Sequence, residues 1–149
     1  MSSQAGYSGT PLPRKIGAKP GDRALVVGAP PGAPVLFEEE VRVLRRAGGA
    51  PLDVIVVFTT ARADLERRLP VLRARLQPAG MLWVAWPKRA SGVPTDPTTG
   101  LRPAVPAEDV VTENVIREVA LPLGLVDTKV AAIDDTWSGL RLVIRKELR

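Results

Sequence analysis

Two short segments that are apolar at nearly every position constrain the fold of this chain most. Residues 52–58 are apolar except for Asp53, and residues 81–86 are apolar throughout. A strand that is apolar on both faces is typical of the middle of a parallel sheet that helices cover on both sides. Both segments are far shorter than the roughly 18 apolar residues of a membrane-spanning helix. The sequence therefore predicts a covered sheet and no membrane span.

Weaker patterns add further strands and two helices. Four more strands are predicted at residues 24–27, 41–44, 125–133 and 140–145. A leucine stripe over residues 65–76 predicts a helix that is capped by Thr59-Thr60, kinked or split at Pro70 and ended by residues 78–80. Valines at 111, 115 and 119 predict a second helix, which starts at Glu108 or Thr112 and stops at residues 121–124.

The alternation of strands and helices predicts an α/β protein, and 149 residues suit a single domain. Right-handed crossovers place the helices on both faces of a mostly parallel sheet. The last two strands are too close in sequence for a crossover, so they must pair as an antiparallel hairpin. This arrangement resembles the class I methyltransferase version of the Rossmann-like fold, which implies three layers. The proline-rich segment 88–106 is expected to be a long loop, either a lid or a disordered insert.

The absence of cysteine and histidine narrows the chemistry that the chain can perform. It excludes thiol nucleophiles, serine–histidine triads and zinc sites built on either residue. Any reaction must therefore use carboxylates, lysine, arginine, tyrosine, hydroxyl groups or a bound cofactor.

The charge distribution bears on partners and on localisation. The chain has 21 Lys and Arg against 16 Asp and Glu, and a net charge of +5 admits an anionic partner. Basic residues alternate with acidic ones, and aromatic residues make up only 4%, which argues against nucleic-acid binding. The first residues carry no apolar run typical of a secretory signal, so we expect a cytoplasmic protein.

One edge of the predicted sheet collects the candidate site residues. Loops that leave the carboxyl ends of parallel strands share one edge, and ligands bind there where the strand order reverses. The candidate ligand-binding residues at this edge are Gly28, Gly32, Arg62, Trp86, Lys88, Arg89, Asp134, Asp135, Trp137 and Ser138. Loops are also where polar residues ordinarily lie, so this convergence has an equally simple structural explanation.

Some of these candidates, and one further lysine, suggest a specific chemistry. Trp86 with the cations at 88–89 could hold a flat or anionic group, unless Trp86 is a core residue. Asp134 and Asp135 could bind Mg²⁺ or share a proton, but such residues are also ordinary in a hairpin turn. Lys129 lies mid-strand and could be a desolvated base or Schiff-base former, or it could extend from a sheet edge into solvent.

The first loop lacks the pattern of a nucleoside-cofactor site. Such sites have spaced glycines after the first strand and an acid after the second, which allow close backbone approach and bind the ribose hydroxyls. Pro30 stands in place of the middle glycine, and Arg45-Arg46 stands where the acid would be. A Walker-type phosphate loop is also missing from the sequence. We therefore predict no cofactor and no metal.

Three motifs carry a family resemblance: Gly-Tyr-Ser-Gly-Thr-Pro-Leu at 6–12, Trp-Val-Ala-Trp-Pro-Lys at 83–88, and the segment 127–140. Together they resemble an uncharacterised actinobacterial family that is defined only as a domain of unknown function. The resemblance implies no activity, but it implies that Tyr7 to Leu12 belong to the ordered domain. Members of that family pass quickly from the second motif into the next helix, so residues 97–106 are expected to be a flexible insertion in a single domain spanning 1–149.

These observations lead to one main hypothesis and two alternatives. The main hypothesis is a noncatalytic binding or regulatory module, a monomer or homodimer, that presents the edge residues to a small anionic ligand or a protein partner. The missing glycine, the missing acid and the absence of histidine and cysteine motivate it. The first alternative is an enzyme, either a divergent S-adenosylmethionine-dependent methyltransferase or another small-molecule enzyme that uses Lys129, Asp134 and Asp135. The second alternative is nucleic-acid binding, which the dispersed charge disfavours.

Overall fold

The computed structural model describes residues 10–46, 48–88 and 109–149. The elements are α1 (Leu12–Ile16), β1 (Arg23–Val27), β2 (Arg42–Leu44), β3 (Leu52–Phe58), α2 (Arg62–Arg75), β4 (Leu76–Pro87), α3 (Glu113–Ala120), β5 (Leu125–Ala132) and β6 (Trp137–Ile144). Two short 3-10 helices, η3 (Leu121–Leu123) and η4 (Lys146–Leu148), follow α3 and β6. The expected insertion at 97–106 lies outside the described residues.

The strands form one sheet in the order β2-β1-β3-β4-β6-β5. Strands β2, β1, β3 and β4 run parallel, and β6 pairs antiparallel with both β4 and β5. The predicted α/β class and the antiparallel pairing of the last two strands are therefore present. The hairpin is not simply added at the sheet end, because β6 inserts between β4 and β5 and makes the sheet mixed.

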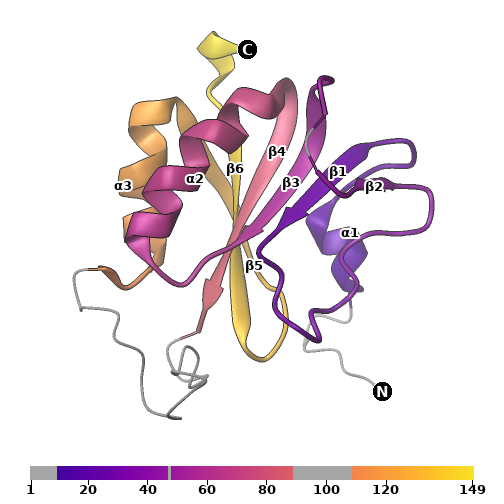
Figure 1. The fold of residues 1–149 in the computed structure, drawn as a ribbon, viewed down its shortest axis with the longest axis horizontal. Helices are drawn as coiled ribbons and strands as arrows, with labels where there is room; N and C mark the ends of the chain where they lie inside the picture. The colour runs from indigo at the N-terminus through magenta and orange to yellow at the C-terminus, as the bar shows by residue number, and fades with distance from the viewer. Residues whose placement is uncertain (1–9, 47, 89–108) are drawn as a thin grey trace.

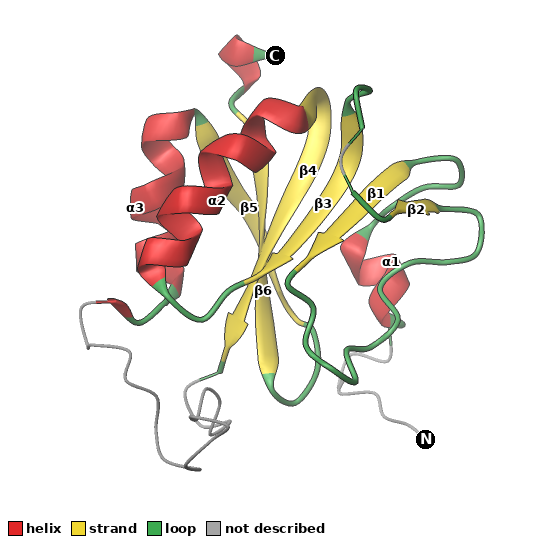
Figure 2. Cartoon of the chain, in the orientation of Figure 1, coloured by secondary structure: helices red, strands yellow, loops and turns green. Residues whose placement is uncertain are grey.

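Helices cover the sheet on both faces (Figures 1 and 2). On one face, α2 and α3 contribute Leu65, Leu69 and Ile116 to a buried core. On the other face, α1 contributes Ile16 to a second core. Alternate residues of β3 enter the two cores, which explains why residues 52–58 are apolar on both faces of the strand.

Helix α2 differs from its prediction at both ends. It begins after Ala61 rather than at the predicted cap Thr59-Thr60, and the Ala63 amide in its first turn donates instead to Asp109 Oδ1 at 2.9 Å. It ends at Arg75, and Leu76 already belongs to β4. Leu76 is buried in the same core as the helical leucines, so the apolar stripe did not reveal that the chain passes from helix to strand before this residue. Of the two effects predicted for Pro70, a kink or a split, the split is wrong, because the helix continues through this exposed residue.

Helix α3 begins at the second of the two predicted starting points. The Thr112 hydroxyl caps it by accepting a hydrogen bond from the Val115 amide at 3.2 Å. The helix passes into η3 and stops at Gly124, whose φ of +79° lies in the left-handed region. Its buried residues are Ile116 and Ala120 rather than the valines at 115 and 119, so the predicted stripe is displaced by one position.

Helix α1 is held to the sheet by one buried hydrogen bond. The Trp83 indole N–H donates to the Ile16 carbonyl at 3.0 Å, and both side chains are fully buried. Gly17 ends the helix with φ +89°. Within the described segments, no helix is both long enough and apolar enough to cross a membrane.

Candidate functional site

The carboxyl ends of β1, β2, β3 and β4 meet at one edge of the sheet because these strands are parallel. The turn between β5 and β6 lies at the same edge, since the Lys88 amide donates to the Thr136 carbonyl at 2.8 Å. We call this border the carboxyl edge. It consists of residues 28–32, 45–46, 59–61, 87–88 and 133–136. The structure thus brings most of the predicted site residues to one side of the molecule.

The strand order reverses between β1 and β3. The chain passes from β1 to β2 on one side, and β3 returns to the opposite side of β1. Gly28 follows β1 at this point with φ +72°, and a Cβ there would lie 2.8 Å from the Phe58 carbonyl oxygen. Only glycine fits this position without moving the backbone at the end of β3.

The loop that follows Gly28 is exposed and contains a second glycine in the left-handed region. Gly32 has φ +78°, and no atom lies within 4 Å of where its Cβ would be. The Ala33 amide closes a turn by donating to the Pro30 carbonyl at 3.1 Å. Pro30 and Pro31 have no N–H, so this loop offers fewer amide donors than a glycine-rich loop of the same length.

The end of β3 is fixed to α2 through Asp64, which sequence reasoning missed. Thr59 is buried and donates its hydroxyl to Asp64 Oδ2 at 2.9 Å, while Arg68 Nε donates to Asp64 Oδ1 at 2.8 Å. Burial alone would raise the pKa of the Asp64 carboxyl, but the hydrogen bonds from Arg68 and Thr59 outweigh burial, and the pKa is lowered. The Thr59-x-x-x-x-Asp64 spacing at a helix start is the only sequence signal for this network, and the spacing is not specific.

Both tryptophans among the predicted site residues face the core. Trp86 is 9% exposed and belongs to the core beneath α2 and α3. Trp137 is 7% exposed and stacks edge-on against Phe58, with ring centroids 5.1 Å apart. Ser138 lies next to Trp137 in β6, opposite Trp86 of β4, and is half-buried. The tryptophan rings are therefore part of the cores next to the carboxyl edge and are not exposed at it.

The basic candidates have different surroundings. Arg62 donates to Glu66 at 2.9 Å and to Glu118 at 2.7 Å, so it joins α2 to α3. Lys88 is half-buried at the end of β4, and Arg89 lies outside the described residues. Lys129 is exposed on β5, the last strand of the sheet, and its Nζ donates to the Lys15 carbonyl at 3.3 Å. An exposed amine is not desolvated, so this placement does not support Lys129 as a base.

The two adjacent acids have separate environments. Asp134 Oδ1 accepts hydrogen bonds from the Thr136 and Trp137 amides, each at 2.8 Å. Asp135 is exposed in the same turn. The Asp134 carboxylate therefore performs the ordinary task of an acid in a turn, which is to bond the backbone amides that follow it.

Comparison with known proteins finds similar structures but no similar sequence among protein families or curated proteins. The sequence matches no protein-family profile and no curated protein. The fold is similar to a SAM-dependent methyltransferase from Aquifex aeolicus, with 15% identity, a TM-score of 0.53, and coverage of 88% of this chain and 87% of that chain. A TehB-like SAM-dependent methyltransferase from Corynebacterium glutamicum has 13% identity and a TM-score of 0.52, with coverage of 89% and 85%.

A third similar structure is the glycopeptide N-methyltransferase MtfA complexed with S-adenosylmethionine. It has 10% identity and a TM-score of 0.52, and the match covers 89% of this chain and 85% of that chain. In contrast, the chain spans about half of the magnesium protoporphyrin IX methyltransferase from Synechocystis PCC 6803, where the match covers 48%. At 10–15% identity, the three similar structures define the fold, which is that of the class I methyltransferases.

These comparisons correct the main hypothesis. The similar structures are named as methyltransferases, and they favour the divergent methyltransferase over a noncatalytic module. The noncatalytic module is therefore contradicted. The missing glycine and acid concern a local motif of the first loop, whereas the comparisons rest on the strand order and the packing of the whole chain. The resemblance to the actinobacterial family stays a prediction, since no family profile matches.

Proposed function

We propose that this protein is a divergent methyltransferase that binds S-adenosylmethionine at the carboxyl edge, between the ends of β1 and β3. The strand-order reversal beside Gly28 carries the proposal, because ligands of open α/β sheets bind where the strand order reverses. The complex of MtfA with S-adenosylmethionine, in a protein of similar fold, supports the choice of ligand. When bound, S-adenosylmethionine supplies a methyl group that the positive charge of its sulfonium activates.

The loop after β1 fits such a ligand through the backbone conformation of its two glycines. A Cβ at Gly28 would clash with the Phe58 carbonyl oxygen at 2.8 Å, so the glycine lets the backbone after β1 approach the end of β3 closely. The left-handed φ of Gly28 and of Gly32 lets the loop between them turn tightly over the edge. The backbone of this loop is therefore the part of the chain that we expect to contact the ligand.

Other residues hold the edge in place. Thr59 and Asp64 join the end of β3 to α2, and the Thr59 amide donates to the Ala85 carbonyl of β4 at 3.0 Å. At the end of β2, Arg45-Arg46 replaces the acid that would accept hydrogen bonds from ribose hydroxyls. The ribose must therefore be bound through backbone carbonyls or the ligand must lie differently along the edge, and this departure makes the proposed enzyme a divergent one.

The proposal is tested by titrating the protein with S-adenosylhomocysteine in a calorimeter, using two matched glycine variants. Gly32 lies at the carboxyl edge and Gly21 lies at the opposite edge, before β1. Both have a positive φ, +78° and +86°, and open space where a Cβ would be. Gly32→Ala and Gly21→Ala therefore introduce the same backbone strain. We expect the wild type and Gly21→Ala to bind equally, and Gly32→Ala to bind several-fold more weakly.

Two outcomes would overturn the proposal. One is the absence of binding heat with the folded wild-type protein. The other is an equal loss of affinity in Gly32→Ala and Gly21→Ala. That result would mean that the ligand binds elsewhere or that both substitutions act only by destabilising the fold. A circular dichroism spectrum of each variant verifies that it is folded before the titration.

A further inference from the structure

One end of the sheet lacks a helical cover on the face that carries α2 and α3. Helix α2 packs on β4 and α3 packs on β5, and no described helix lies over β1 and β2 on this face (Figure 2). Val27 of β1 and Leu44 of β2 lie at the margin of the core there and are half-buried. A sheet face of this kind ordinarily buries its apolar side chains against another element.

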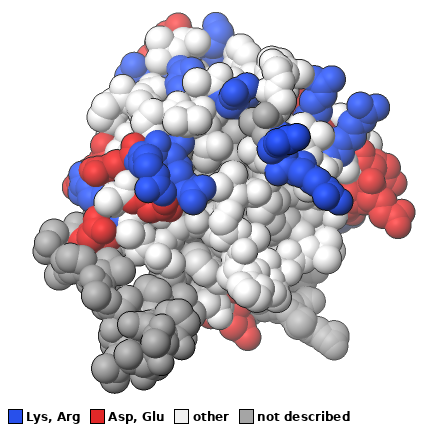
Figure 3. Space-filling view, in the orientation of Figure 1, with Lys and Arg blue, Asp and Glu red and all other residues white. Residues whose placement is uncertain are grey.

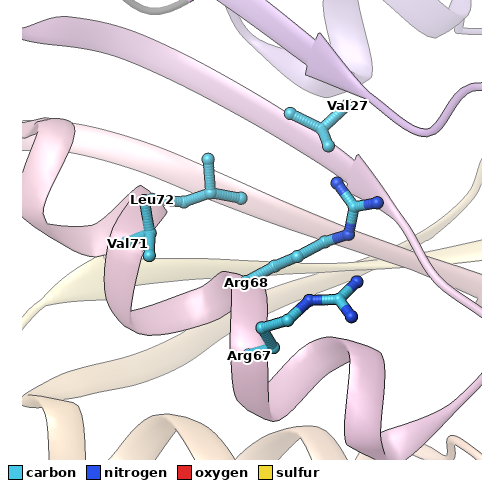
Figure 4. A pocket seen from close by; sticks show the side chains of 5 residues that line it. All are labelled: Val27, Arg67, Arg68, Val71 and Leu72. Atoms are coloured by element: carbon cyan, nitrogen blue, oxygen red, sulfur yellow. The ribbon is translucent and has the colours of Figure 1, made fainter.

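A groove of about 390 Å³ lies between this open sheet end and α2. Figure 4 shows its lining: Val27 comes from β1, and Arg67, Arg68, Val71 and Leu72 come from α2. Val71 is 61% exposed and, with Val27 and Leu72, gives the groove an apolar lining. The groove thus has an aliphatic floor that is open to solvent.

Arginines line the groove on its α2 side, and further arginines lie on and after β2, the strand that pairs with β1. Arg67 and Arg68 both pair with the single carboxylate of Asp64, which leaves one positive charge without a matching acid. Figure 3 shows an uncharged surface between two groups of Lys and Arg, one over α2 and the other beside β2. Arg42, Arg45 and Arg46 are the exposed arginines of β2 and the residues after it, and none of them forms an ion pair with a described residue.

We propose that this groove binds an acidic amphipathic helix of a partner protein. The apolar face of the helix would lie on Val27, Val71 and Leu72, and its acidic flanks would face Arg67 on one side and Arg45 or Arg46 on the other. Recognition of this type places one apolar stripe in a groove while flanking charges fix the orientation. The proposal does not rest on the proposed methyltransferase function, because it is argued from the lining and charge of the groove, although Val27 adjoins Gly28 of the carboxyl edge.

Charge and chemistry select this occupant over two others. A two-fold dimer of this chain would set the same patch against itself and bring arginines against arginines, which is repulsive. A nucleic acid would match the charge, but its bases stack on aromatic side chains, and the described lining of the groove contains no aromatic residue. A helix with leucines on one face and glutamates beside them would pack its leucines on the apolar residues of the groove and pair its glutamates with the arginines.

The test uses a synthetic helical peptide of about 18 residues, or about five turns, with leucines on one face and glutamates on both flanks. Its binding to the full chain is measured by fluorescence anisotropy. A second peptide carries glutamine in place of every glutamate. Val71→Glu and Arg67→Glu change the groove, and Val130→Glu and Arg145→Glu are the matched controls, because Val130 is 52% exposed on β5 and Arg145 is exposed after β6.

We expect Val71→Glu and Arg67→Glu to weaken binding of the acidic peptide about tenfold or more, whereas both control variants bind as the wild type does. The glutamine peptide should bind more weakly than the acidic one. The proposal is overturned if the acidic peptide does not bind, if the controls lose as much affinity, or if glutamine substitution has no effect. Concentration-dependent dimerisation that Val71→Glu abolishes would assign the groove to a second copy, and displacement of the peptide by single-stranded RNA would assign it to nucleic acid.

Discussion

Single side chains decide how α1 is attached to the sheet. Trp83 has the largest fully buried side chain of the described residues, and its N–H satisfies the carbonyl of Ile16. Trp86, three residues later in β4, faces the opposite core and is nearly as buried, but its indole forms no comparable bond to a described residue. The two tryptophans therefore differ chiefly in the hydrogen bond.

This difference predicts the effect of two substitutions to phenylalanine. Trp83→Phe removes ring atoms from the core and leaves the Ile16 carbonyl without its donor, whereas Trp86→Phe removes ring atoms only. We expect Trp83→Phe to lower the free energy of unfolding more than Trp86→Phe does, by about 1–2 kcal/mol. Urea unfolding followed by circular dichroism measures both values. Equal losses would show that the buried bond contributes nothing net.

At the scale of elements, Asp64 connects the end of β3 with the start of α2. Its carboxylate accepts hydrogen bonds from Thr59 and Arg68 and also pairs with Arg67. The lowered pKa of Asp64 means that the folded protein favours the charged carboxylate, so this group stabilises the fold above its unfolded-state pKa. The stabilisation is lost as the pH falls through the lower, folded-state pKa.

Asp64→Asn is therefore expected to lower the free energy of unfolding by about 1 kcal/mol at pH 7. The difference from the wild type should begin to shrink below about pH 4, where the unfolded chain takes up the proton first. Urea unfolding at a series of pH values provides the measurement. Asp135→Asn is the control, because Asp135 is exposed, and it should leave the stability at pH 7 unchanged. A difference for Asp64→Asn that stays constant down to pH 3 would contradict the prediction.

At the scale of the whole molecule, ligand binding and folding are linked. A ligand that binds only the folded chain stabilises it by about 2.7 kcal/mol at a concentration one hundred times its Kd. For a protein of this size, each kcal/mol corresponds to a rise in Tm of about 2–4 °C. S-adenosylhomocysteine at that excess should thus raise the Tm by about 5–10 °C, as measured by calorimetric scanning. L-methionine at the same concentration should not, and an equal rise with L-methionine would argue against a nucleoside site.

The sequence predicted the layered α/β class because burial on both faces leaves a local pattern. Residues 52–58 are identical in bounds to β3, and the strand predicted at 81–86 lies within β4. The predicted gathering of loops at one edge also follows from chain direction, since strands that alternate with helices run parallel. Lys88 and Thr136 are in contact for a different reason, which is that β6 pairs antiparallel with β4 and sets Trp137 opposite Pro87, although 48 positions (136 minus 88) separate the two residues in the sequence.

The orientation of the candidate side chains could not be predicted in the same way. Trp86 and Trp137 look alike in sequence whether they face a ligand or the core, because both environments favour aromatic residues. Lys129 lies among apolar neighbours in the sequence, and of its two interpretations the extension from a sheet edge into solvent fits the structure, because β5 is the last strand of the sheet. Asp64 gave no distinctive signal, because its partners Thr59 and Arg68 are common residues at a helix start.

The sequence by itself determined the approximate positions of the strands and of the two longer helices and the exclusion of thiol and imidazole chemistry, since these depend on residue type and local spacing. Only the tertiary structure decided that β6 inserts between β4 and β5, that both edge tryptophans are buried, and that a groove bordered by arginines lies beside β1. Strand order and side-chain exposure are set by pairing and packing between segments far apart in the chain, and no local pattern encodes those contacts.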